Sequence, residues 1–117
     1  MADFRPSHNR GYQFPRRLLA KGGSGDNIVV NLAPGVHFEL LEVRLVLGGS
    51  ATGNLSVTAD HDQGAEHDVT VDTVDVSGAN QHRKKYDWKF FGGTGIDFAW
   101  TNSGVSWALE VFYRELT

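Results

Sequence analysis

The chain has 117 residues and a mass of 12.9 kDa, enough for one domain with a single core but too little for a second domain or a deep interdomain cleft. It contains no cysteine, which excludes disulfides, a thiolate nucleophile and zinc sites built on sulfur. No apolar run approaches the roughly 20 residues of a membrane-spanning helix, and the first residues lack the apolar segment of a signal peptide. We therefore expect a soluble protein made in the cytoplasm, with no membrane partner.

The net charge of −3 is distributed unevenly along the chain. Residues 1–21 hold five Lys or Arg against one Asp, a balance of +4, and the remaining 96 residues sum to −7. A glycine-rich stretch at residues 22–26 separates the two parts. We expect an extended basic N-terminal arm over residues 1–25, which either docks on an acidic partner or remains a solvated tail, and a folded domain over residues 26–117.

Short strands are predicted through the first half of the domain. Residues 28–32 are a β-branched run that ends at a proline–glycine turn formed by Pro34 and Gly35. Residues 36–47 alternate with period two, and the phase shifts between Leu40 and Leu41. This shift predicts a β-bulge or a bend, because one extra residue reverses the faces of a strand. A helix is the alternative for this stretch.

The second half continues the alternation without a helical period. Strands are predicted over residues 55–59, 69–76, 86–90, 96–100 and 105–113. Residues 81–85 are polar and basic, and we expect them to form an exposed loop. Seven or eight short strands about ten residues apart predict an all-β fold, an antiparallel β-sandwich of the jelly-roll type, with a small barrel as the alternative.

The aromatic residues of the strands are expected mainly in the core. On the alternating pattern Trp88, Phe98, Trp100 and Trp107 face inward with the aliphatic side chains. A tryptophan in a patch between subunits is the alternative for one of them.

One polar segment has the composition of a cation site. The nine residues from Asp60 to Asp68 hold four carboxylates and two imidazoles. Asp60, Asp62 and Asp68 offer oxygens to a hard cation, but their spacing is not that of an EF-hand, and His61 and His67 lack the HExxH arrangement of a zinc site. We expect a solvated hairpin loop without metal or cofactor, and leave cation binding by this loop open.

Catalytic motifs are absent from the sequence. No serine lies in a nucleophile-elbow context, and the glycine clusters lack the lysine and the helix of a phosphate-binding loop. The aspartates of the strands are expected on exposed faces, where they keep a sheet soluble. We therefore expect a protein that is not an enzyme and has no catalytic residues.

A basic patch at Arg83, Lys84 and Lys85 lies beside Tyr86 and Trp88. Cations next to aromatic side chains can bind single-stranded nucleic acid. A nucleic-acid interface needs a broad basic surface, however, and this patch lies in an acidic domain. We expect no direct nucleic-acid binding, and a loop that is either solvated or meets an acidic protein neighbour.

Four strand patterns resemble those of small virion structural proteins of tailed bacteriophages. The patterns are FELLEVRL at residues 38–45, GNLSVT at 53–58, GIDFAW at 95–100 and WALEVFYR at 107–114. The resemblance covers about residues 36–115 and leaves out the arm.

The resemblance implies a virion component, and the size of the chain favours one kind. A small β-domain is similar to capsid decoration, or cement, proteins, which bind the outer shell of the head and stabilise it. The implied partners are the major capsid protein and further copies of the chain at the capsid surface, with a trimer as one form of self-association. The alternatives are a tail, neck or fibre-base component, or a glycan-binding β-sandwich with exposed tryptophans.

Docking by the arm and the basic patch is the specific expectation. Aromatic and arginine side chains interleaved in a polar segment are typical of interface anchors rather than of solubilising residues. The candidate partner-binding residues are Phe4, Arg5, Arg10, Tyr12, Phe14, Arg16, Arg17, Arg83, Lys84 and Lys85.

Overall fold

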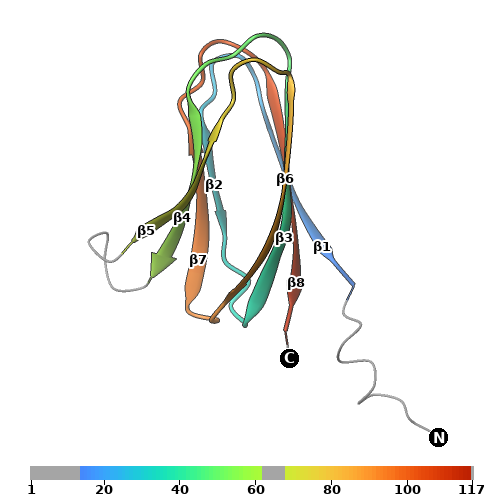
Figure 1. The fold of residues 1–117 in the computed structure, drawn as a ribbon, viewed down its shortest axis with the longest axis vertical. Helices are drawn as coiled ribbons and strands as arrows, with labels where there is room; N and C mark the ends of the chain where they lie inside the picture. The colour runs from blue at the N-terminus through green and yellow to red at the C-terminus, as the bar shows by residue number, and fades with distance from the viewer. Residues whose placement is uncertain (1–13, 62–67, 117) are drawn as a thin grey trace, which may run out of the picture.

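A computed structural model describes residues 14–61 and 68–116, which form eight strands in two facing sheets (Figure 1). The strands are β1 (Arg16–Gly22), β2 (Ile28–Leu32), β3 (Phe38–Leu47), β4 (Asn54–His61), β5 (Val69–Asp75), β6 (Gln81–Phe90), β7 (Thr94–Trp100) and β8 (Trp107–Glu115). Within these described residues no helix is long and apolar enough to cross a membrane.

The order of the strands is that of a jelly roll. One sheet has the order β1-β8-β3-β6 and the other β2-β7-β4-β5, and all neighbouring strands are antiparallel. Apart from the β4–β5 hairpin, every connection crosses from one sheet to the other. Two four-stranded sheets wound in this way are the eight-stranded double Greek key. The expected all-β sandwich of jelly-roll type is confirmed.

Two local predictions for β3 and the turn before it are confirmed. The pairing of β3 with both β6 and β8 shifts register between Leu40 and Glu42, where the phase of the sequence changes. Gly35 in the preceding turn has a φ of 81°, a conformation that glycine adopts without steric cost. The bulge keeps the apolar residues on both sides of it turned toward the core.

Strand β1 lies inside the stretch that the sequence assigns to the arm. Residues 16–22 pair with β8 over seven positions, from Arg16 opposite Tyr113 to Gly22 opposite Trp107. Leu18 and Ala20 pack against the core, whereas the arginines and Leu19 are exposed. The sandwich therefore starts at residue 16, and residues 1–13 lie outside the described part of the chain.

The core lies between the sheets and includes two of the tryptophans. Phe98, Trp100 and Trp107 are buried, as predicted, whereas Trp88 is only half-buried. Both buried indoles are hydrogen-bonded, Trp100 Nε1 to the Thr52 carbonyl at 3.0 Å and Trp107 Nε1 to the Asp26 carbonyl at 2.8 Å. Each ring thus satisfies its one polar atom while filling the core.

Candidate functional site

Charge is divided between the two sheets. The strands of the β1-β8-β3-β6 sheet carry nine Lys or Arg and five Asp or Glu, a balance of +4. The strands of the other sheet carry four Asp and no Lys or Arg, a balance of −4. We call them the basic sheet and the acidic sheet. The cationic character expected of the arm and of the patch at residues 83–85 therefore extends over one whole sheet of the sandwich.

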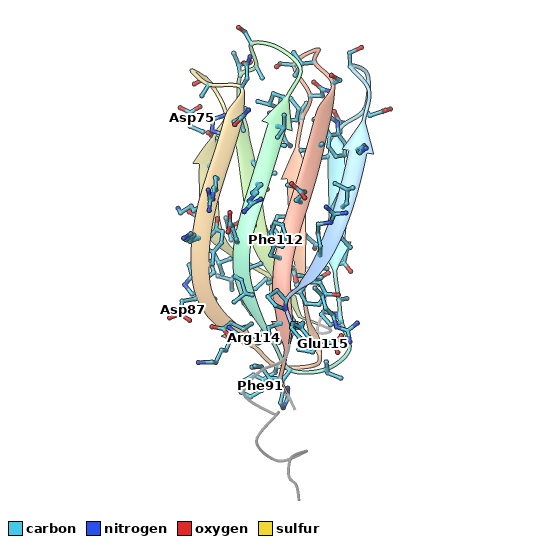
Figure 2. All side chains as sticks on the ribbon, turned by 90° about the vertical axis from the view of Figure 1, so that its right-hand side faces the viewer. Asp75, Asp87, Phe91, Phe112, Arg114 and Glu115 are labelled. Atoms are coloured by element: carbon cyan, nitrogen blue, oxygen red, sulfur yellow. The ribbon has the colours of Figure 1, made fainter. Side chains whose placement is uncertain are left out.

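The outer face of the basic sheet holds a cross-strand ion-pair network (Figure 2). Glu42 Oε2 accepts hydrogen bonds from Nε of Arg44 at 2.7 Å and from Nε of Arg83 at 2.6 Å. The hydrogen bond from Arg44, with a further contribution from Arg83, lowers the pKa of Glu42 despite partial desolvation. On the same face Arg17 pairs with Glu110 at 3.1 Å.

Phe112 lies near the centre of this outer face (Figure 2). The guanidinium of Arg44 lies 4.9 Å from the centroid of its ring, within cation–π range. Nearby, Arg114 pairs with the buried carboxylate of Glu39 at 3.3 Å. The face thus combines an aromatic surface with arginines that are already oriented, a composition typical of protein interfaces.

The interpretation of residues 81–85 as a loop was wrong, because they form the first half of β6. β6 is an edge strand, so both of its faces are partly solvated and the apolar alternation is weak there. Of the three predicted patch residues, Arg83 and Lys84 are held in intramolecular ion pairs, with Glu42 and Asp72. Lys85 is exposed and has no ion pair among the described residues.

Lys84 belongs to a polar cluster at the edge between the two sheets. Its Nζ lies 2.6 Å from Asp72 Oδ2, and the Tyr86 hydroxyl donates to the same oxygen at 2.7 Å. Burial alone would raise the pKa of Asp72, but the hydrogen bonds from Lys84 and Tyr86 outweigh it and lower that pKa. Burial and the hydrogen bond to Asp72 raise the pKa of Tyr86. This cluster joins β5 to β6 and is structural.

The predicted arm residues are only partly described. Phe4, Arg5, Arg10 and Tyr12 lie outside the described residues. Phe14 has 89% of its surface exposed. Arg16 and Arg17 are on β1, where they pair with Glu115 at 3.5 Å and with Glu110 at 3.1 Å. These two arginines thus extend the basic sheet to its edge.

Three carboxylates meet at one end of the acidic sheet. Each of Asp60, Asp68 and Asp97 offers an oxygen that lies within 4.8 Å of the others, and Asn31 Nδ2 donates to Asp97 Oδ1 at 2.6 Å. The negative charge of Asp97, followed by desolvation and by Asp68, raises the pKa of Asp60. Among the described residues this is the group that could hold a hard cation. No sequence pattern places Asp97 at this cation site, because Asp97 reaches the cluster only through strand pairing.

An apolar groove lies at the same end, beside the β6–β7 connection. It is lined by His37, Lys89, Phe90, Phe91 and Leu116. Phe91 is 78% exposed, and its ring meets that of His37 edge-on at 5.4 Å. Figure 2 shows Phe91 at the lower end of the sandwich. This groove could not be predicted from the sequence, because Phe91 directly follows Phe90 and resembles the last residue of a core strand.

Comparison with known proteins gives a fold and no family. No protein-family model matches the sequence, and no curated protein is significantly similar to it. Among solved structures, the mitogen YPM of Yersinia pseudotuberculosis superposes with a TM-score of 0.51 at 12% identity. The match covers 90% of this chain and 87% of the mitogen. At this identity the likeness supports the β-sandwich fold alone.

Proposed function

We propose that this protein is a non-enzymatic virion structural protein, a capsid decoration or cement protein that binds the outer shell of a phage head. The observation that carries the proposal is the separation of charge, with +4 on the strands of one sheet and −4 on those of the other. A jelly roll with one cationic, arginine- and aromatic-bearing face is suited to lie flat on an acidic protein surface.

The basic face supplies the contact with the shell in this proposal. Lys85 and Lys89 on β6 and Lys21 on β1 are exposed and have no ion pair among the described residues. They are available to carboxylates of the major capsid protein, while the paired arginines present an ordered surface between them. The N-terminal segment, with Phe4, Arg5, Arg10, Tyr12 and Phe14, lies across a neighbouring subunit and adds a second contact.

The same surface also suits a tail, neck or fibre-base component, which remains the alternative proposal. A glycan-binding module receives no support from the tryptophans that would serve it. Trp100 and Trp107 are buried and their indole nitrogens are hydrogen-bonded within the sandwich.

The decisive experiment adds purified protein to phage heads that lack it. We expect saturable binding and an increased resistance of the heads to heat and to internal DNA pressure, with binding that weakens as salt screens the charges. Labelling of intact virions shows where the protein lies. A label on the tail supports the alternative, and heads that neither bind the protein nor gain resistance overturn the proposal.

A further inference from the structure

Two hollows adjoin each other at the end of the sandwich where β1 begins. The first is the apolar groove, with a volume of about 300 Å³. The second is an acidic hollow that includes Asp60 and is continuous with the carboxylates of Asp68 and Asp97. The β6–β7 connection separates them, since Phe91 lines the first and Gly92 the second. We call the two hollows together the cradle.

The cradle is preformed and its apolar half is uncovered by the described residues. The Gly92 backbone N–H donates to His37 Nδ1 at 2.9 Å, which holds the connection against the β2–β3 turn. Leu116 donates its backbone N–H to the His37 carbonyl at 2.7 Å, which adds the C-terminal residues to the same wall. The ring of Phe91, 78% exposed, forms a contiguous apolar surface with Phe90 and Leu116, and such a surface is typical of a binding site.

The N-terminal segment has the chemistry that matches both halves of the cradle. It carries aromatic rings at Phe4 and Tyr12 and cations at Arg5 and Arg10, close to the aromatic residues in sequence. An aromatic ring fits the apolar groove, and a guanidinium fits the three carboxylates. Thirteen residues reach about 43 Å when extended, which is far enough to leave one sandwich and contact another.

The direction in which the chain enters β1 favours binding of the N-terminal segment to the cradle of a neighbouring molecule over the cradle of the same molecule. Two strands, β8 and β3, separate β1 from β6, so Phe91, which follows β6, lies about 14 Å to the side of the start of β1. Pro15 restricts Phe14 to extended conformations, so residues 14 and 15 continue the direction of β1. The exposure of the Phe14 side chain agrees with this direction.

We propose that the N-terminal segment of one copy of this chain binds the cradle of a second copy. Phe4 or Tyr12 occupies the groove beside Phe91, and Arg5 or Arg10 faces Asp60 and its neighbours. The inference deepens the proposed function by naming the neighbouring subunit, and it rests on that function only for the role of the contact in a virion.

Sedimentation velocity of the full-length protein over a range of concentrations tests the contact. We expect the wild type to self-associate and Phe91→Ser to weaken the association about tenfold or more, because it removes the ring from the groove. Val29→Ser is the matched control. Val29 is 83% exposed but lies on β2, and its substitution should leave the association unchanged. Circular dichroism and thermal melts verify that both variants fold.

A mixing experiment separates binding between copies from binding within one copy. Phe91→Ser retains an intact arm, and the double variant Arg5→Glu/Arg10→Glu retains an intact cradle. At a concentration where each variant alone is monomeric, an equimolar mixture should form a heterodimer of twice the 12.9 kDa monomer mass. An arm that binds its own cradle leaves this mixture monomeric.

The proposal is overturned by a wild type that stays monomeric, by a mixture that stays monomeric, or by equal behaviour of the Phe91 and Val29 variants. These results differ from failure of the proposed function, which is measured with undecorated heads. Wild-type protein that protects heads without self-associating refutes the arm–cradle contact alone. Protein that self-associates without binding heads refutes the decoration role alone.

Discussion

Asp72 is a partly buried carboxylate with three polar partners. It accepts from Lys84 and from Tyr86 at the margin of the core, and its Oδ1 accepts from the backbone N–H of Thr73 at 2.8 Å. Hydrogen bonds that satisfy a partly buried acceptor contribute about 1 kcal/mol each. We expect Tyr86→Phe to lower the free energy of unfolding by about 1 kcal/mol, measured by urea denaturation.

Asp72→Asn should show the pH dependence of the same cluster. The pKa of Asp72 is lowered by folding, so its ionised form stabilises the folded state above the unfolded pKa of about 3.9. The stability gap between wild type and Asp72→Asn should therefore be full at neutral pH and close as the pH falls through the folded pKa. Asp87→Asn, at an exposed position without an ion pair among the described residues, is the control and should leave stability nearly unchanged.

Asp60 should behave in the opposite way. Its pKa is raised by Asp97, so its ionised form is unfavourable in the folded state at neutral pH. We expect Asp60→Asn to raise Tm at pH 7 in the presence of a chelator, and the gain to disappear as acid protonates Asp60 in the wild type. Asp75 is the contrasting control. Hydrogen bonds from Ser77 lower its pKa, so Asp75→Asn should reduce Tm. A lowered Tm in Asp60→Asn would contradict the repulsion.

β1 differs from the sequence prediction, which assigns its residues to an extended arm. Leu18 faces the core and Leu19 faces solvent, so one strand offers an internal comparison. We expect Leu18→Ser to cost about 1–2 kcal/mol of unfolding free energy and Leu19→Ser less than about 0.5 kcal/mol, measured by urea denaturation. Equal and small effects would show that residues 16–22 do not belong to the sandwich in solution.

The sequence predicts the strands of the acidic sheet and the central strands of the basic sheet well, and the edge strands of the basic sheet poorly. β3, β7 and β8 have a partner strand on each side. These strands and β2 bury one face, so their apolar residues alternate clearly with more exposed ones. β1 and the first half of β6 are edges of the basic sheet and carry six of its nine cations. Charge at an edge opposes aggregation through strand pairing, and it also hides the strand pattern.

The candidate site is less predictable than the fold because it is assembled by strand pairing. Asp97 joins Asp60 only through the β4–β7 register, and Phe91 joins His37 only where two connections meet. Charge counted along the chain gives a basic arm on an acidic domain, whereas the fold sorts alternate segments into two sheets of opposite charge. No local motif contains that information.

For the whole molecule, the separation of charge predicts which face binds. The double variant Lys85→Gln/Lys89→Gln removes two exposed cations from the basic sheet, and Thr70→Glu/Thr73→Glu adds two anions to exposed positions of the acidic sheet. Both change the net charge by −2. We expect only the first to weaken binding to undecorated heads, by several-fold at low salt, because rim charges act mainly on association. Equal weakening would indicate a response to net charge alone.

The pairing of the first strand with the last determines how this molecule bears a mechanical load. The start of β1 and the end of β8 lie at the same end, where Arg16 is opposite Tyr113. A force that pulls the two termini apart acts on one residue pair at a time, so β1 separates from β8 pair by pair. A force between the N-terminal segment and the opposite end of the sandwich acts along the strands and loads all seven pairs together in shear. A tether through residues 1–13 is therefore strong when the pull runs along the strands and weak when it works against the C-terminus.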